Sequence, residues 1–392
     1  MHHYPSYLIA LLGTAALIYF LKPRAIHIGL VDRPDARKAH LVATPLVGGL
    51  AIFCGFLASL ATFGIALNDL RFLAAGLVLT VVGMLDDFHE ISPKLRFLAQ
   101  IAAALLMTLW GGVVLHDLGA LSFDGSLFTL GDLAIPVTVF ATVGVINALN
   151  MSDGMDGQAG SLTLIALLGL VVVTYVAGQY VELNILLLLA SAVVAFLAFN
   201  LRLPWRPRAS VFLGDAGSMF LGFTLAWFMI HLSQGEPRAM SPVTALWFLM
   251  LPLLDTVGMM LRRIGKRRSP FQADREHFHH LLLSAGYSPM QSVLIMAGLA
   301  LVGVMIGLAG WFFEVPDILM FAAFLGLATL YFWGMMHAWK VMRFFGRVIG
   351  PRYGGTAEAK QTLPGVYAHF KASDDTSDLR TAKAMMEESD RA

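Results

Sequence analysis

The chain has 392 residues, of which 57% are hydrophobic and only 14% are charged. A soluble globular domain carries about a quarter charged residues, so this composition excludes a soluble domain and indicates a protein that lies in a bilayer. The 27 Lys and Arg residues nearly balance the 26 Asp and Glu residues, which argues against a nucleic-acid partner, and the single cysteine, Cys54, excludes a disulfide framework or a cysteine-based metal site.

Long apolar stretches recur along the whole chain. A membrane-spanning helix needs about 20 mostly apolar residues. Eleven stretches meet this requirement, so the sequence predicts an all-α, polytopic membrane bundle of about eleven transmembrane helices. The expected stretches are residues 6–21, 46–67, 70–85, 95–115, 133–149, 160–178, 183–200, 211–232, 241–261, 291–312 and 317–339.

Basic residues are distributed very unevenly between alternate loops. One set of loops holds 25 Lys and Arg residues, and the other holds only Arg71 and Arg238. Cytoplasmic loops of membrane proteins carry the excess of Lys and Arg. We therefore expect a periplasmic N-terminus, a cytoplasmic C-terminus, a membrane domain at 1–340 and a polar, partly disordered cytoplasmic tail at 341–392.

The first cytoplasmic loop mixes acids and bases. It contains Asp32, Lys38 and His40 around a proline at position 34. Two interpretations are open here, a proline turn that sets topology or a set of groups that binds a lipid phosphate.

The third apolar stretch ends in adjacent acids. Asp86 and Asp87 are followed one turn later by Glu90. Such an oxygen-rich patch suits Mg²⁺, which takes one or two protein carboxylates together with waters and substrate phosphates. The alternative is a solvated helix end.

The loop after the fifth stretch combines acids, amides and glycines. Asn147 and Asn150 precede Asp153 and Asp156, and glycines at 154, 157 and 160 accompany the acids. Glycines let backbone N–H groups approach an anion, and the helix start that follows favours phosphate. A purely structural turn would not need this combination.

Another acid, Asp215, stands at the cytoplasmic start of the eighth stretch. Asp215 follows the basic residues Arg202, Arg206 and Arg208. It could be an ordinary helix cap. However, acids from three loops then converge on one membrane face, which helix capping alone does not explain.

The ninth stretch and the loop after it carry the remaining polar groups. Asp255 lies within the stretch, so it should face the bundle interior and have a partner or a purpose. The Arg262–Arg268 cluster can set topology or attract anionic lipid. The spacing of His277, His279 and His280 could hold zinc, but the carboxylates elsewhere favour Mg²⁺, and we expect these histidines to donate to phosphate oxygens or to shape the substrate pocket.

Together, these motifs resemble the polyprenyl-phosphate N-acetylhexosamine-1-phosphate transferases, most closely the WecA-type branch. The resemblance covers residues from about 30 to 340. It rests on the LDD, NxxNMxDGxDG, FLGDxGS and HxHH segments, which stand at Leu85–Asp87, Asn147–Gly157, Phe212–Ser218 and His277–His280. The histidine pattern is that of the branch acting on simple UDP-N-acetylhexosamines, and Glu90 stands where that branch usually has Asp.

The resemblance implies transfer of N-acetylglucosamine 1-phosphate, or a related N-acetylhexosamine 1-phosphate, from the UDP-sugar to undecaprenyl phosphate. UMP would be released and synthesis of a lipid-linked polysaccharide would begin. The implied setting is the bacterial inner membrane, with the active site facing the cytoplasm, and a homodimer is compatible with it.

The roles that follow for individual residues fall into three groups. The expected catalytic residues are Asp86, Asp87, Asp153 and Asp156. Asp215 and Asp87 are expected to hold Mg²⁺, for which Mn²⁺ can substitute. The expected substrate-binding residues are Asp32, Lys38, His40, Asn147, Asn150, Arg275, His277, His279 and His280.

Proteins of other classes could also place acids in membrane helices. A transporter would scatter acids through the spans, whereas here they cluster at one face. An intramembrane aspartyl protease pairing Asp255 with Asp215 would need both acids at depth, whereas Asp215 stands at a helix entrance. A non-catalytic lipid-binding homologue is the third alternative. Release of UMP from a UDP-sugar in the presence of polyprenyl phosphate separates all of these from the transferase.

Overall fold

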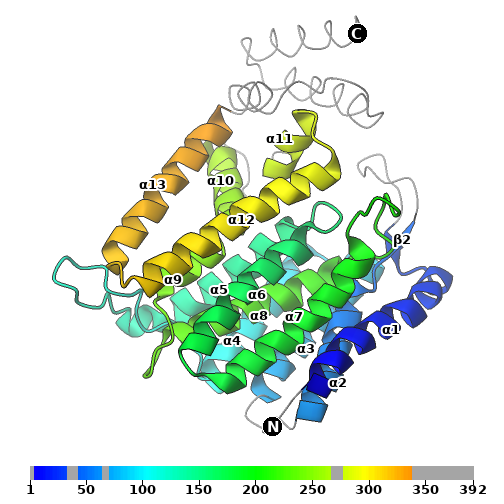
Figure 1. Ribbon diagram of the computed structural model, residues 1–392, viewed down its shortest axis with the longest axis horizontal. Helices are drawn as coiled ribbons and strands as arrows, with labels where there is room; N and C mark the ends of the chain where they lie inside the picture. Colours follow the sequence, from blue (N-terminus) through cyan, green and yellow to red (C-terminus); the bar gives the residue numbers. More distant parts are fainter. Residues whose placement is uncertain (1–3, 33–42, 64–69, 266–276, 338–392) are drawn as a thin grey trace, which may run out of the picture. The chain divides into compact units, whose positions relative to one another are not determined.

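The computed structural model is built almost entirely of helices and describes residues 4–32, 43–63, 70–265 and 277–337 (Figure 1). The longer helices are α1 (Tyr4–Ile28), α2 (Gly48–Phe63), α3 (Leu70–His89), α5 (Ala134–Met151), α6 (Gln158–Val176), α7 (Tyr180–Asn200), α8 (Gly214–Ser233), α10 (Met250–Gly265), α12 (Pro289–Phe312) and α13 (Asp317–Met336). The shorter ones are α4 (Pro93–Leu105), the π-helical turn η2 (Leu106–Trp110), the 3-10 turn η3 (Gly131–Leu133), α9 (Pro242–Phe248) and α11 (Phe278–Ser284). Two short strands, β1 (Val31–Asp32) and β2 (Thr44–Pro45), pair antiparallel.

Eight helices of the described residues are long and apolar enough to cross a membrane, namely α1, α3, α5, α6, α7, α8, α12 and α13. The bent pair α9 and α10 would make a ninth span. The expected stretch at 46–67 corresponds to the 16-residue α2, and that at 95–115 corresponds to α4 and η2. Helices thus occupy every expected stretch, and the prediction of a helical membrane protein is confirmed with eight or nine spans by length and composition.

The chain divides into two compact units. The first comprises the residues up to Leu253 together with Met296–Leu325, and the second comprises Leu254–Ile295 and the residues from Gly326 onward. The first unit contains the acidic motifs around Asp86, Asp153 and Asp215, and the second contains Asp255 and the histidines. Each unit is described by itself below.

Helix α8 forms the centre of the first unit. It packs mainly against α3 and α5, and also against α2 and α6 (Figure 1). Of its most hydrophobic 18-residue window, 94% is buried, and Phe220 and Phe223 are fully enclosed. A helix that is apolar on all sides is expected in such a position. The residues at its start are therefore fixed relative to the core.

Glycines allow the neighbouring helices to approach the start of α8 closely. A Cβ atom on Gly49 of α2 would overlap the backbone of Gly217, and one on Gly83 of α3 would overlap that of Ala216. Small residues permit this kind of backbone contact between membrane helices. As a consequence, the last turn of α3 lies directly beside the first turn of α8.

Backbone hydrogen bonds fix the segment that leads into α8. The N–H of Phe212 donates to the carbonyl oxygen of Pro45 in β2 over 2.8 Å, and the carbonyl oxygen of Phe212 accepts from the N–H of Gly48 over 2.9 Å. Gly214 has φ 73°, in the left-handed region, and a Cβ there would meet Oδ2 of Asp87 at 2.5 Å. Only glycine suits this position.

Candidate active site

The Asp87 carboxylate caps the first turn of α8 from outside that helix. Its Oδ1 accepts from the N–H of Asp215 over 2.8 Å, and its Oδ2 accepts from the N–H of Ala216 over 3.3 Å. The first N–H groups of a helix lack partners within the helix. Because Asp87 supplies the acceptors here, the Asp215 side chain is not needed as a cap for its own helix.

The Asp215 carboxylate instead faces groups from two other helices. Its Oδ1 accepts from Nδ2 of Asn150, at the end of α5, and the same Nδ2 lies 2.9 Å from Oγ of Ser218. Its Oδ2 lies 3.5 Å from a guanidinium nitrogen of Arg96. The Asp215 side chain remains 26% exposed, so its carboxylate is accessible to a ligand.

Arg96 joins the two acidic motifs. The same guanidinium nitrogen lies 2.7 Å from Oδ2 of Asp86, a residue that is only 5% exposed. Arg96 stands in the first turn of α4, which begins with Ser92 as N-cap and Pro93 as its first residue. One cation thus serves the buried carboxylate of Asp86 and the accessible one of Asp215.

Asp153 lies in the glycine-containing loop between α5 and α6. Its removal from water, together with the nearby charges of Asp215 and Asp156, raises the pKa of Asp153 to about 7. At neutral pH this group is therefore divided between its acid and its carboxylate form, which suits a residue that exchanges or shares a proton.

Asp156, three residues later, is part of a structural network. Its Oδ2 accepts from Nε of Arg202 over 2.8 Å and from the N–H of Ala209 over 3.0 Å. The neighbouring N–H of Gly157 donates to Oδ1 of Asn200 over 2.7 Å. These contacts tie the α5–α6 loop to the basic segment that leads into α8.

The remaining predicted residues of the first unit lie around this centre. Asn147 donates from Nδ2 to Oε1 of Gln100 over 2.6 Å and to the carbonyl oxygen of Val143 over 2.8 Å, so its amide faces α4. Asp32 lies in β1, paired with Thr44 of β2. Glu90 is exposed at the end of α3 with φ 47°. Lys38, His40 and Arg275 lie outside the described residues.

The chemistry of this donor set fits a hard cation. Asp86 and Asp215 share one guanidinium, and Asp87 binds the backbone N–H of Asp215, which leaves an excess of oxygen acceptors. In the described part of the chain, no three His, Cys, Asp or Glu side chains are arranged to hold a metal by themselves. Mg²⁺ suits such a site, because it usually shares one or two carboxylates with waters and substrate phosphates.

In the second unit, the histidine motif surrounds a buried carboxylate. Asp255 on α10 is 2% exposed, and its Oδ2 lies 2.9 Å from Nδ1 of His277. Its Oδ1 accepts from the N–H of Phe278 and from the hydroxyl of Tyr331, both over 2.9 Å. The expectation that Asp255 faces the interior and has partners is confirmed.

The other two histidines of the motif follow along α11. The His279 ring stacks on that of His277 with the ring centroids 5.6 Å apart and the planes inclined by 6°, and the His280 ring lies 4.1 Å from that of His279. His279 is 2% exposed, and its Nδ1 has no hydrogen-bond partner among the described residues. Burial and the neighbouring histidines lower the pKa of His279 to about 3, so its ring is neutral at physiological pH.

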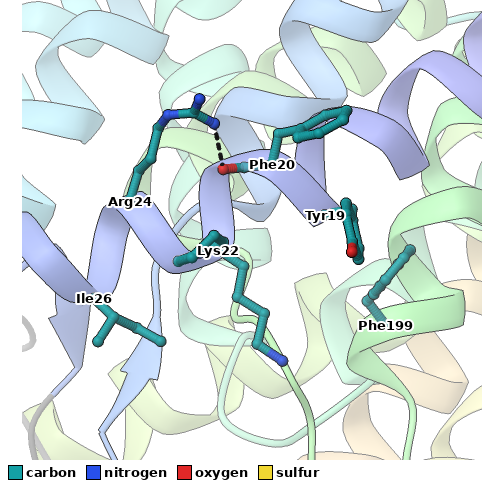
Figure 2. Close-up of a pocket in the computed structure, with 7 residues that line it drawn as sticks. Tyr19, Phe20, Lys22, Arg24, Ile26 and Phe199 are labelled. Atoms are coloured by element: carbon teal, nitrogen blue, oxygen red, sulfur yellow. Dashed lines mark hydrogen bonds between the residues drawn. The ribbon is translucent and has the colours of Figure 1, made fainter.

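A groove of the described surface is lined by none of the motif residues. Its volume is about 660 Å³, and it is lined by Tyr19, Phe20, Lys22, Pro23, Arg24 and Ile26 of α1 and by Phe199 of α7 (Figure 2). Arg24 folds back and donates to the carbonyl oxygen of Phe20 over 2.7 Å. Aromatic and basic residues at a helix end are typical of a membrane interface, and this groove holds no carboxylate for the chemistry described above.

Comparisons with known proteins identify the family of this chain. The family model described as Glycosyl transferase family 4 matches residues 70–233, which include all the acidic motifs of the first unit. A protein of Escherichia coli (strain K12) named undecaprenyl-phosphate alpha-N-acetylglucosaminyl 1-phosphate transferase is 37% identical over 342 residues, covering 86% of this chain and 92% of the relative. This chain belongs to the family of these transferases.

Other family members show similar extents of identity. A relative of the same name from Haemophilus influenzae is 37% identical over 347 residues, covering 88% of this chain and 97% of its own length. One from Yersinia pestis is 36% identical over 338 residues. The family resemblance inferred from the four motifs is confirmed.

Two residues that hold parts of the site in place, Arg96 and Asn200, were assigned no specific role from the sequence. Arg96 counts in the sequence only toward topology, yet it joins Asp86 and Asp215. Asn200 ends an apolar stretch, yet it holds the N–H of Gly157 and donates to the carbonyl oxygen of Val211 over 2.9 Å. A signal was available for Arg96 alone, because it follows the acids within a short loop and opens the next helix.

Proposed function

We propose that this chain transfers N-acetylglucosamine 1-phosphate from its UDP derivative to undecaprenyl phosphate, releases UMP, and so begins a lipid-linked cell-envelope glycan such as O-antigen. The names of the relatives support the acceptor and the transferred group. The observation that carries the proposal is the meeting of Asp86, Asp87 and Asp215 with Arg96 and Asn150 at one end of the helices.

The reaction makes and breaks one phosphorus–oxygen bond. An oxygen of the lipid phosphate attacks the sugar-bearing phosphorus, and the bond from that phosphorus to the bridging oxygen breaks, so UMP leaves with the electron pair. The lipid phosphate is largely dianionic at neutral pH, because the second pKa of a phosphate monoester is about 6. The main obstacle is therefore repulsion between two anions, which positioned positive charge relieves.

We assign the cation site to Asp215, with Asp87 as its neighbour. When bound there, Mg²⁺ supplies charge neutralisation for the donor diphosphate, and Mn²⁺ is the expected substitute. Asp87 holds the start of α8 through two backbone N–H groups, which keeps the Asp215 carboxylate in place. Asn150 donates to the same carboxylate and so fixes its orientation.

Asp86 and Asp153 are the residues we assign to the acceptor phosphate. Asp86 is buried against Arg96, which leaves the guanidinium between that acid and Asp215, where it can also approach a phosphate oxygen. Asp153 has the proton affinity expected of a group that accepts a proton near neutral pH. Asp156, bound to Arg202, positions the loop that carries Asp153.

Substrate contacts are proposed for further residues. Asn147 and the histidines His277, His279 and His280 are assigned to the donor, together with Arg275. The first cytoplasmic loop, with Asp32, Lys38 and His40, is assigned to the lipid phosphate. A homodimer is compatible with these assignments.

The proposed setting is the bacterial inner membrane, with eleven spans, a periplasmic N-terminus and the active site facing the cytoplasm. The split of 25 basic residues to two supports this topology. One of the two outward basic residues, Arg238, pairs with Asp117 over 2.6 Å, which neutralises it. Reporters fused after His116 and after Arg263 should lie on opposite sides of the membrane, and finding both on one side would overturn the span count. The membrane domain ends near 340, and the tail at 341–392 lies outside the described residues.

A donor panel tests the activity itself. Purified protein is incubated with undecaprenyl phosphate, Mg²⁺ and one of UDP-N-acetylglucosamine, UDP-N-acetylgalactosamine or UDP-glucose, and UMP release and the lipid product are measured. We expect UMP and a lipid-linked sugar diphosphate from UDP-N-acetylglucosamine, and neither without the acceptor. Absence of UMP release with all three donors would refute the proposal.

A further inference from the structure

The histidine motif of the second unit contains three rings, and their surroundings differ. His277 has a carboxylate partner at Nδ1, whereas Nδ1 of the adjacent His279 has no hydrogen-bond partner among the described residues. The two rings stack nearly parallel, with their centroids 5.6 Å apart. Of these two, only His277 is therefore equipped to carry a stable positive charge.

The hydrogen bonds of Asp255 determine which atom of His277 carries a proton. An ionised carboxylate only accepts hydrogen bonds, so Nδ1 of His277 must be the donor in the 2.9 Å contact with Oδ2. Nε2 is then the ring atom that remains for a ligand. A carboxylate on one nitrogen and a phosphate oxygen on the other both favour the doubly protonated ring.

The other side of Asp255 makes this arrangement rigid. Oδ1 accepts from the N–H of Phe278, adjacent to His277, and from the hydroxyl of Tyr331 on α13. These two donors prevent the carboxyl group from turning about its bond. Burying a carboxylate in a membrane helix costs free energy of insertion, so such a residue indicates a functional role.

We propose that Asp255 is a positioning residue that fixes the ring and the protonation of His277, so that Nε2–H of a positively charged His277 donates to the diphosphate of the UDP-sugar. This inference rests on the proposed function for the identity of the donor. It assigns different roles within the motif: His277 provides charge, and His279 provides a neutral surface that supports the His277 ring.

The substitution Asp255→Asn tests the assignment sharply. The Phe278 N–H can only donate, so it requires an oxygen at the Oδ1 position, and the new amide must turn its NH₂ toward His277. Nδ1 of His277 must then accept, which forces a neutral ring with its proton on Nε2. The variant keeps the size and packing of the side chain while removing the charge.

Tyr331→Phe is the matched control. It removes one hydrogen bond to the same carboxylate but leaves the contact between Asp255 and His277 intact. If Asp255 only holds helices together, both variants should lower the melting temperature and the activity in parallel.

We expect Asp255→Asn to lower kcat/KM for the UDP-sugar about 10-fold, because Nε2–H still donates but without the positive charge that makes such a bond about twice as strong, with a melting temperature near that of Tyr331→Phe. Tyr331→Phe should stay within about 3-fold of wild type, because the Phe278 N–H still holds Oδ1 and the contact of Oδ2 with His277 is unchanged. Asp255→Asn combined with His277→Gln should be no worse than His277→Gln alone, because both act through one group. An Asp255→Asn activity within about 3-fold of wild type, or losses that add in the double variant, would overturn the proposal.

A spectroscopic readout separates failure of this inference from failure of the proposed function. In protein labelled with ¹⁵N-histidine, the ring nitrogen shifts report which nitrogens carry protons, whether or not the enzyme turns over. We expect Nδ1 of His277 to be protonated in wild type and in Tyr331→Phe, and unprotonated in Asp255→Asn. Unchanged shifts in Asp255→Asn would contradict the positioning role. Absence of turnover with normal shifts would instead count against the donor assignment.

Discussion

The carboxylate of Asp87, at the end of α3, accepts the backbone N–H of Asp215, at the start of α8, over 2.8 Å. These two acids, far apart in the sequence, therefore have different roles: one holds a helix backbone and the other presents a carboxylate. Asp87 holds the backbone, and the Asp215 side chain is left to face Asn150 and Arg96. This division leads to different expectations for the two acids.

Replacing each acid by its amide should separate the two roles. Asp215→Asn should reduce turnover at least about 10²-fold with an unchanged melting temperature, because only one partly exposed oxygen is exchanged. Asp87→Asn should lower turnover and also destabilise the fold by about 1 kcal/mol, because an amide has one acceptor oxygen for two backbone donors. Turnover and thermal unfolding of the purified variants in detergent provide the measurement. Equal losses of stability in both would contradict the division.

Arg96 should influence the metal requirement. Its guanidinium lies near two carboxylates that a cation would also approach, so it competes with Mg²⁺ by charge repulsion. Arg96→Gln should lower the Mg²⁺ concentration for half-maximal rate while lowering kcat, because a phosphate-binding cation is lost. A Mg²⁺ titration of wild type, Arg96→Gln and Arg96→Lys tests this, with the lysine variant expected between the others. A higher Mg²⁺ requirement in Arg96→Gln would count against the expectation.

Asp153 should make stability depend on pH. Burial and the charges of Asp215 and Asp156 raise the pKa of Asp153 from 3.8 to about 7. The folded protein therefore keeps a proton that the unfolded chain loses, so the stabilising contribution is full below about pH 4 and declines as the pH rises through about 7. In metal-free buffer, Asp153→Asn should reduce the fall in melting temperature between pH 5 and pH 8. The exposed-acid control Asp132→Asn should retain the fall seen in wild type.

Glycine contacts at α8 give a test of the packing that supports the site. Gly83 stands three residues before Asp86, and a Cβ atom there would overlap the backbone of Ala216. A Cβ atom at Gly144 of α5 would meet nothing within 4 Å. Gly83→Ala should separate α3 from α8 and impair both folding and activity. Gly144→Ala should be neutral or slightly stabilising, because alanine favours a helix over glycine by about 1 kcal/mol. Similar yields and rates for both variants would show that the close approach is not required.

Much of the fold was predictable because apolar length is a direct signal in a membrane protein. In the described residues, each expected apolar stretch contains a helix, from 6–21, within α1, to 317–339, which overlaps α13. Apolar length alone did not reveal the interruption of the expected stretch 241–261 at Leu249, where α9 ends and α10 begins. Pro252, in the first turn of α10, lacks the N–H that would bind the carbonyl oxygen of Phe248, so a continuous helix is broken near this position.

The candidate site was predictable as a set of motifs but not as a network. Spacing indicated that Asp87 and Asp215 share one membrane face, but it could not show that one caps the helix of the other. That contact depends on Gly83 and Gly49, whose effect is tertiary packing rather than local pattern. Likewise, Asp255 was expected to have a partner, but its contact with His277 joins residues 22 positions apart, which no local pattern indicates.

The burial of α8 also bears on how the enzyme responds to the bilayer around it. The hydrophobic window of α1 is only 22% buried, so that helix must adjust its tilt to the thickness of the hydrocarbon layer, whereas α8 is enclosed by protein along nearly its whole length. Asp215 is attached to the enclosed helix and not to one that lipid surrounds. When the acyl-chain length changes, the outer helices such as α1 should therefore adjust their tilt while α8 keeps its position. The distances between Asp215 and its neighbouring acids should then be the same in membranes of different composition.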